Sequence, residues 1–302
     1  AINRENGTLR HLNTLPSMGA NPVSFIIDKT NSRVIVGNHG AVEKIVTIKK
    51  VNGVPTIESP TDEATVALYA VKPDGSLEPA MDVSVFEPRP MSDTSGPGAA
   101  CHAVTFDRTQ RWLIASDNGY DHIYVYPFAP NMRELKAKSF PTPAGKAPRH
   151  LVAHKRAPYF FMTNEREASV SSFHFDSDTG DARAIQTIAT VPDGYAGPRV
   201  SPTDIRMHPN GKFIYAANRG DDSIAIFSID EQSGRMNRVD VSKCGGQGPR
   251  ELNIEPSGKF LFSCNLQSND VVTFALDSNT GKMTQTAKVS VPQAAVIDFA
   301  VL

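Results

Sequence analysis

Five segments of the chain repeat a single pattern of apolar and polar residues. Each copy has an apolar run, a polar turn, a second apolar run that ends in Asn or Asp, a short turn and a third apolar run. A unit of this size cannot bury its own apolar faces, so the copies must stack against one another. The repeated end residues, which we call the anchors, are 79, 47, 54 and 47 residues apart: Asn38, Asp117, Asn164, Asn218 and Asn265.

The apolar runs predict β-strands, because they are short, rich in β-branched and aromatic residues and separated by Gly, Pro, Asn and Asp. Helical periodicity is nearly absent. Four antiparallel strands in a unit of about 50 residues are typical of a β-propeller blade. A turn and a fourth run follow most copies, in the stretches DGSLEPA from Asp74, NMRELKA from Asn131, TGDARAI from Thr179, SGRMNRV from Ser233 and TGKMTQT from Thr280.

The two ends of the chain bear on the number of blades. NGTLRHL from Asn6 resembles the last strand of a blade, and residues 294–302 resemble a first strand. Six blades close a ring if the two ends share one blade, whereas seven require about 50 residues before Ala1. We expect an all-β, seven-bladed propeller in a single domain over residues 1–302, with its N-terminal blade partly missing from this chain.

The long first interval between anchors indicates an insertion at residues 49–64. This segment precedes the third strand of the first copy, at Val66 to Val71. Its mixed charge is compatible with a mobile lid or a longer hairpin, and we favour the hairpin.

Composition argues against several classes of function. The formal net charge is -1, whereas binding to nucleic acid or to an anionic membrane needs clustered Lys and Arg. No run of about 18 apolar residues could span a membrane. Three scattered cysteines, Cys101, Cys244 and Cys264, predict neither a disulfide framework nor a zinc site and favour a reducing compartment. We therefore expect a cytoplasmic protein that binds neither nucleic acid nor membrane.

Equivalent residues of successive blades converge on the axis of a propeller, because the first strand of each blade lines the central channel. Fifteen residues before the anchors lie Val23, His102, Arg149, Thr203 and Arg250. One residue after the anchors lie His39, Asn118, Glu165, Arg219 and Leu266. We predict that both sets face one site, with catalytic candidates His102, Arg149, Glu165 and Arg219. The substrate-binding candidates are Arg250, Arg206, Asn118 and His39.

Residues of these types favour chemistry on a small anion. Several arginines around one axis bind carboxylate or phosphate, a glutamate can orient an arginine or act as a base, and a histidine suits proton transfer near neutral pH. The sequence has no Gly-x-Ser-x-Gly elbow, no HExxH and no Cys/His metal spacing, so we expect neither a metal nor a cofactor.

Other readings of these residues are structural. The anchors suit tight turns that are capped by local hydrogen bonds. Glu165 can also pair with Arg166 on a surface turn, and Arg219 with Asp221 or Asp222. The remaining histidines fall outside both sets and are interpreted as structural or surface residues: His150, His154, His174 and His208.

Several stretches resemble the lactonase family of seven-bladed propellers, namely GKAPRHLVAH, TNE, YAANRGDDSIAIFSID, GQGPREL and the repeated DxxTGxM turns. That family includes bacterial 6-phosphogluconolactonases and fungal 3-carboxy-cis,cis-muconate lactonizing enzymes. The resemblance covers essentially the whole chain. It implies an active cleft lined by Arg149, Glu165, Arg219 and His102, without a metal. PRHLVAHKRAP replaces the family's PRHxxFHP and PREL replaces its PRxF, which leaves the substrate less closely defined.

Three functions fit the sequence. In the first, the protein hydrolyses a small anionic lactone of the 6-phosphogluconolactone type, with arginines holding the anion and His102 or Glu165 activating water. In the second, the same site cyclises 3-carboxy-cis,cis-muconate, a cycloisomerase reaction. In the third, a non-catalytic propeller binds a ligand or a protein on its face. The sequence does not set the oligomeric state.

Overall fold

The computed structural model describes residues 1–40, 47–51, 54–58, 64–86 and 98–300, and these residues form strands but no helix. Accordingly, the described residues contain no helix long and apolar enough to cross a membrane. The first blade consists of β1 (Pro22–Ile27), β2 (Arg33–Asn38), β5 (Thr65–Ala70) and β6 (Asp82–Val85). The second consists of β7 (Cys101–Phe106), β8 (Trp112–Asp117), β9 (His122–Pro127) and β10 (Lys138–Pro141).

Three further blades follow in chain order. The third consists of β11 (Pro148–Ala153), β12 (Tyr159–Asn164), β13 (Ser169–Phe175) and β14 (Ala182–Ala189). The fourth consists of β15 (Ser201–Met207), β16 (Phe213–Arg219), β17 (Ser223–Ile229) and β18 (Met236–Lys243). The fifth consists of β19 (Pro249–Ile254), β20 (Phe260–Asn265), β21 (Asp270–Leu276) and β22 (Met283–Ser290).

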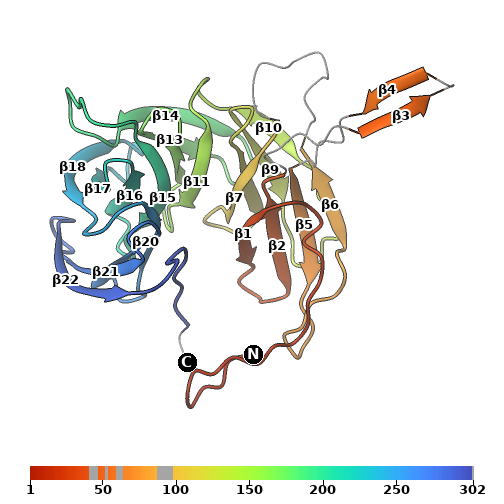
Figure 1. Ribbon diagram of the computed structural model, residues 1–302, viewed down its shortest axis with the longest axis horizontal. Helices are drawn as coiled ribbons and strands as arrows, with labels where there is room; N and C mark the ends of the chain where they lie inside the picture. The colour runs from red at the N-terminus through yellow and green to blue at the C-terminus, as the bar shows by residue number, and fades with distance from the viewer. Residues whose placement is uncertain (41–46, 52–53, 59–63, 87–97, 301–302) are drawn as a thin grey trace.

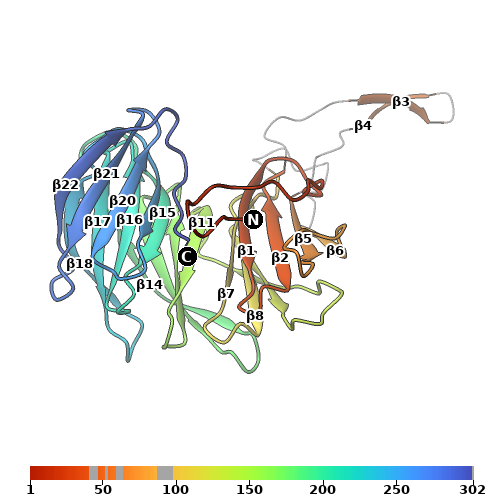
Figure 2. The same ribbon diagram turned by 90° about the horizontal axis from the view of Figure 1, so that it is seen from below.

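The blades are arranged as an arc around a common axis. Within each blade, every strand pairs antiparallel with the next, and neighbouring blades touch through their first strands, β1, β7, β11, β15 and β19 (Figure 1). The segments before β1 and after β22 lie at the opening of the arc, and Figure 2 shows the same arrangement from below. The all-β propeller with four antiparallel strands per blade is confirmed.

The strands expected at the two ends of the chain were wrong. Near the N-terminus the structure has only an isolated bridge between Ile2 and Leu9, and residues 294–300 contain no strand; residues 301–302 lie outside the described residues. Neither segment has a neighbouring strand to take its backbone hydrogen bonds. Instead, the C-terminal segment is held by the Asn253 side chain, which donates to the Ile297 carbonyl oxygen at 2.9 Å.

The insertion contains the expected hairpin. Strands β3 (Thr47–Val51) and β4 (Val54–Glu58) pair antiparallel, and Figure 1 shows them apart from the five blades. The rest of the insertion, at 52–53 and 59–63, lies outside the described residues.

Every blade has the same irregularity at the start of its first strand. The residue sixteen positions before each anchor pairs with that anchor, and the register shifts immediately afterwards. A β-bulge therefore lies at the same place in all five blades, and such bulges redirect side chains away from the regular ladder. The bulge residues include the set counted from the sequence: Val23, His102, Arg149, Thr203 and Arg250.

The anchors have the structural role that the sequence predicted. All five are fully buried. The Asn218 amide donates to the Thr190 carbonyl oxygen at 2.9 Å and to Ser223 Oγ at 3.1 Å. The Asp117 carboxylate accepts from the backbone N–H of Ala100 at 2.8 Å. The Ser223 bond closes the turn between β16 and β17, and the bonds with Thr190 and Ala100 tie these two anchors to the segments that precede β15 and β7.

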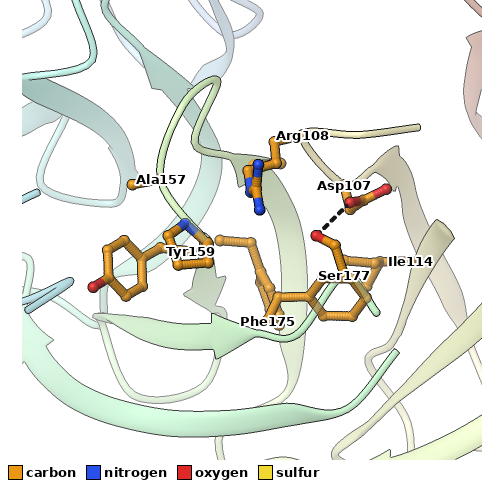
Figure 3. Close-up of a pocket in the computed structure, with 10 residues that line it drawn as sticks. Asp107, Arg108, Ile114, Ala157, Tyr159, Phe175 and Ser177 are labelled. Atoms are coloured by element: carbon orange, nitrogen blue, oxygen red, sulfur yellow. Dashed lines mark hydrogen bonds between the residues drawn. The ribbon is translucent and has the colours of Figure 1, made fainter. Parts of the chain in front are cut away.

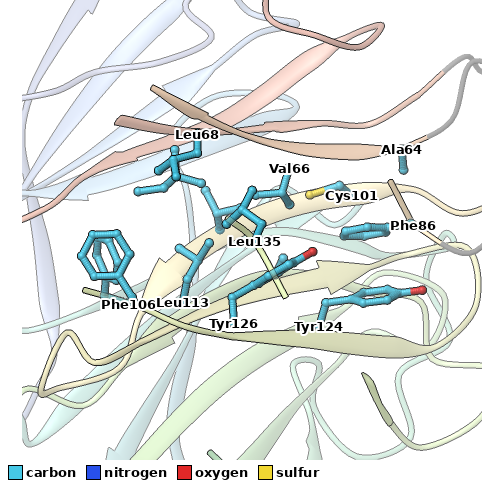
Figure 4. Packing of buried hydrophobic residues seen from close by; sticks show 14 residues of the cluster. Ala64, Val66, Leu68, Phe86, Cys101, Phe106, Leu113, Tyr124, Tyr126 and Leu135 are labelled. Carbon is cyan, nitrogen blue, oxygen red and sulfur yellow. The ribbon is translucent and has the colours of Figure 1, made fainter. Parts of the chain in front are cut away.

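The core consists of layers between neighbouring blades. Figure 4 shows the layer between the first and second blades, where Leu68 of β5 faces Leu113 of β8 and Phe86 stacks on Tyr124 with ring centroids 4.1 Å apart. Equivalent buried clusters occupy the next three interfaces. Because such layers are close-packed, the first strands are held rigidly around the axis.

A small cavity lies between the second and third blades, at the end opposite the bulges. Its volume is about 10 Å³, which is room for one water molecule. Ser177 Oγ donates to the Asp107 carboxylate at 2.9 Å at its edge (Figure 3). This cavity is too small for a substrate.

Candidate active site

A cleft of about 520 Å³ opens at the end of the ring where the bulges lie. This volume suits a small-molecule ligand. Its walls come mostly from the turns that follow the second strands of successive blades, with a contribution from the start of β15. The residues that line it are Asn118, Glu165, Arg166, Arg199, Ser201, Arg219, Gly220 and Gln267.

The Glu165 carboxylate joins side chains from three blades. Its Oε1 accepts a hydrogen bond from Arg219 Nη2 at 3.0 Å, and its Oε2 accepts one from Asn118 Nδ2 at 3.1 Å. Arg149 Nε lies 3.6 Å from the same Oε2. The structure therefore brings together four of the residues chosen from the sequence, and Glu165 pairs with these arginines.

Arg149 lies beneath the cleft and is 3% exposed. Its Nε and Nη1 have no hydrogen-bond partner among the described residues. Burial lowers the pKa of Arg149 to about 10, while the carboxylates of Glu165 and Asp204 raise it, so the side chain is charged at neutral pH. A buried guanidinium with free N–H groups can bind an anion or a developing oxyanion.

His102 lies within a group of histidine rings. Its ring is 5.5 Å from that of His39 and 5.3 Å from that of His150, measured between centroids. Burial, together with the charge of Arg149, lowers the pKa of His102 well below its usual value. Its Nδ1 is buried without a partner in the described part of the chain. His102 is therefore neutral at physiological pH and can accept a proton.

His150 does not have the separate structural or surface position assigned to it from the sequence. Besides touching the His102 ring, it hydrogen-bonds through Nδ1 to Asp204 Oδ1 at 2.7 Å. The repeat contains a signal for this arrangement: the residues fourteen positions before three successive anchors are His150, Asp204 and Glu251. His154 and His208, by contrast, are buried and contact backbone carbonyl oxygens of turns at Gly211 and Gly258.

Three predicted substrate-binding residues do not line the cleft. Arg206 is bound by two carboxylates, with Nε 3.0 Å from Asp204 Oδ2 and Nη2 2.9 Å from Glu251 Oε1. Arg250 makes no hydrogen bond or ion pair with the described residues, but its charge helps to lower the pKa of Arg149. Among the described residues, His39 reaches the site through its contact with the His102 ring. Asn118 is the one candidate of this group placed at the cleft.

Asp204 and Glu251 share the guanidinium of Arg206. Asp204 also accepts from His150 and from the Leu252 N–H at 2.9 Å, so Asp204 is the carboxylate that stays ionised. Burial and the charge of Asp204 raise the pKa of Glu251 to about 7, against the opposing charge of Arg206. Glu251 therefore binds a proton more tightly in the folded protein than in the unfolded chain.

This proton affinity predicts how stability responds to Glu251→Gln. In the wild type, the contribution of Glu251 to the free energy of unfolding is fully present below its unfolded pKa of about 4.5 and is lost as the pH rises through about 7. The variant mimics the protonated state, so its free energy of unfolding should match that of the wild type at pH 4.5 and exceed it by about 1–3 kcal/mol at pH 8. Urea unfolding at both pH values measures this difference. A difference that does not grow with pH would contradict the shared-guanidinium arrangement.

Five cleft residues were not proposed as site residues from the sequence: Arg166, Arg199, Ser201, Gly220 and Gln267. Arg166 was considered only as a surface partner of Glu165, yet Arg166, Gly220 and Gln267 are each two residues after an anchor. Ser201 directly precedes Pro202, the residue that pairs with the anchor Asn218. Arg199 lies nineteen residues before its anchor, where the other four blades have Gly19, Gly98, Gly145 and Gly246, so the shared pattern does not mark an arginine there. Within the described residues, no three His, Cys, Asp or Glu side chains are arranged to hold a metal ion.

Comparisons with known proteins agree with this architecture. The family model described as "Lactonase, 7-bladed beta-propeller" matches residues 1–299. A 6-phosphogluconolactonase of Bacillus subtilis is 27% identical over 251 residues, which are 82% of this chain and 64% of that protein. One of Formosa agariphila is 26% identical over 256 residues, 82% of this chain and 65% of that protein. The matched region thus spans less than two thirds of these relatives.

A solved structure extends the comparison to the fold. The periplasmic gluconolactonase of Pseudomonas aeruginosa superposes with a TM-score of 0.73 at 23% sequence identity, covering 99% of this chain and 93% of that one. The repeat, the arc of blades and the family match over nearly the whole sequence lead to one conclusion. The chain belongs to the lactonase family of seven-bladed β-propellers.

Proposed function

We propose that the protein hydrolyses a small anionic sugar lactone, of the 6-phosphogluconolactone type, in the cleft above Arg149. The observation that carries the proposal is the carboxylate of Glu165, which contacts Arg149 and Arg219. The charge of Arg149 also acts on His102 and helps to lower its pKa. The named activity of the Bacillus subtilis and Formosa agariphila relatives supports the same substrate class.

The proposed reaction begins with the attack of water on the lactone carbonyl carbon. His102 takes a proton from the water as the new carbon–oxygen bond forms, and the carbonyl oxygen becomes an oxyanion. Arg149, whose Nε and Nη1 have no partner among the described residues, stabilises that oxyanion through its guanidinium. The bond from the carbonyl carbon to the ring oxygen then breaks, and the protonated His102 returns its proton to the leaving oxygen. The product is the open hydroxy acid, which ionises in solution.

Glu165 has a different task from His102. It is held by two arginines and an amide, so it orients the guanidinium groups and balances their charge. An anionic substrate beside Arg149 would also offset the positive charge that opposes protonation of His102.

Turnover assays with two substrates test the proposal. The purified protein is incubated with 6-phosphoglucono-1,5-lactone and separately with 3-carboxy-cis,cis-muconate, with an enzyme-free blank to subtract spontaneous hydrolysis. We expect turnover of the lactone and a loss of about 100-fold or more in folded Arg149→Ala and Glu165→Ala. Turnover of the muconate alone would establish the cyclising reaction instead, and turnover of neither would favour a binding protein. Unchanged lactone turnover in both variants would overturn the site but not the activity.

A further inference from the structure

Two arginines at the edge of the cleft have no part in the proposed hydrolysis. Arg166 follows β12, and Arg199 lies in the loop before β15. Both side chains are exposed, and neither forms a hydrogen bond or an ion pair with any described residue. Arg219, in contrast, already gives one N–H group to Glu165. The two edge guanidinium groups therefore keep all their donors for a ligand.

The position of Arg199 is set by close packing of its backbone. A Cβ atom on Gly220 would lie 2.3 Å from the Arg199 carbonyl oxygen, and Gly220 has a φ of +104°, which side-chain-bearing residues rarely adopt. The loop is tied to the same turn a second time, because Tyr195 donates a 3.3 Å hydrogen bond from its hydroxyl to Asp221 Oδ1. Arg199 is thus held beside the turn that begins at Arg219, on the same cleft.

The charge of the cleft differs from that of the whole chain. Three arginines and one glutamate line it, a net charge of +2, whereas the formal net charge of the chain is -1. A phosphate monoester carries a charge of about -1.5 to -2 at neutral pH. Against the net charge of +2, a substrate with a single carboxylate would leave one positive charge uncompensated. A neutral sugar lactone would leave two.

We propose that Arg166 and Arg199 form a phosphate subsite that selects phosphorylated lactones over neutral ones. This inference rests on the proposed function, since it assigns a binding site to the phosphate end of the same substrate. Arginine binds phosphate through paired N–H groups with matching geometry, and Ser201 and Gln267 add polar groups to the same wall. The lactone carbonyl then lies toward Arg149 and His102, while the phosphate lies at the open edge.

A comparison of two lactones tests the subsite. Wild type, Arg166→Gln, Arg199→Gln and the double variant are assayed with 6-phosphoglucono-1,5-lactone and with glucono-1,5-lactone. In the double variant we expect the ratio of kcat/KM, phosphorylated over neutral, to fall about 10- to 100-fold, mainly through KM. Arg235→Gln is the matched control, because it removes an exposed arginine from the β17–β18 turn at the opposite end of the blade. Its ratio should equal that of wild type.

A binding measurement separates failure of the subsite from failure of the proposed function. Isothermal titration with 6-phosphogluconate and with gluconate needs no turnover, so it applies even if wild type hydrolyses neither lactone. We expect wild type to bind 6-phosphogluconate and the double variant to bind it about 10-fold or more weakly. Lactone turnover with an unchanged substrate ratio would overturn the subsite and leave the hydrolase intact. The phosphate subsite would likewise be overturned if wild type and double variant bound 6-phosphogluconate equally, or if wild type did not bind it.

Discussion

Glu165→Gln is expected to lower kcat for lactone hydrolysis by about 100-fold or more without raising KM. Glutamine preserves the size of the side chain and an oxygen acceptor for Arg219, but it removes the negative charge that Arg149 and Arg219 share. Without that charge, both guanidinium groups bind the anionic ground state at least as tightly, so KM stays level or falls. Their orientation toward the transition state is lost, so kcat falls.

Steady-state kinetics on the folded variant, at a pH where the lactone is stable, measure both parameters. Glu167→Gln is the control, because that carboxylate pairs with Lys146 and does not line the cleft. The control should keep the kcat and KM of wild type. If Glu165→Gln retains kcat within about threefold of wild type, the shared carboxylate is not part of the catalytic machinery. A rise in KM with unchanged kcat would instead make Glu165 a simple binding residue.

The sequence predicts the parts of the site that the repeat specifies. Each anchor pairs with the residue sixteen positions earlier, so counting from the anchor finds the bulge in every blade. That count brings Arg149 and Glu165 together, although Arg149 is on β11 and Glu165 follows β12. Arg206 was a further candidate outside the two counted sets, and its partners Asp204 on its own strand β15 and Glu251 on β19 decide where its guanidinium points.

The features that the sequence did not predict depend on which residue occupies a repeated position and on whether a neighbouring strand is present. Arg199 lies where the other four blades have glycine, and its carbonyl oxygen packs on Gly220 as that of Gly98 packs on Gly119. The end segments contain strand-like residues, yet Leu9 stays exposed because no neighbouring strand covers it. Strand formation needs a partner as well as suitable residues, and a partner is a property of the whole fold.

Asp204→Asn is expected to lower the free energy of unfolding by about 3 kcal/mol at pH 7. Asp204 is buried, and its carboxylate accepts from His150, from Leu252 and from Arg206. Asparagine matches its size but places an N–H₂ group against one of these donors. Urea unfolding measures the loss. Asp193→Asn is the control, because Asp193 pairs with Arg238 while its side chain is 97% exposed, and exposed pairs contribute less than about 1 kcal/mol.

The pH dependence of this loss has a definite sign. Burial raises the pKa of Asp204, but the charge of Arg206 and the hydrogen bond from His150 outweigh it and hold the pKa below the usual value. The contribution of the carboxylate is therefore present above the unfolded pKa of about 3.8 and is lost as the pH falls through the lower folded value. The difference in the free energy of unfolding between wild type and Asp204→Asn should have its largest value at pH 6 and should shrink below pH 3.8. A difference that grows in acid would contradict an ionised Asp204.

Combining the two carboxylate variants should reverse the effect of Glu251→Gln. With Asp204 present, Glu251 is the second anion on one guanidinium, so its neutralisation stabilises the protein at pH 8. With asparagine at position 204, Glu251 becomes the sole carboxylate bonded to Arg206 among the described residues, and removing its charge leaves a partly buried cation unpaired. We expect Glu251→Gln to be destabilising in that background, with a coupling energy above about 1 kcal/mol in a double-mutant cycle. Additive effects would mean that the two carboxylates do not compete for Arg206.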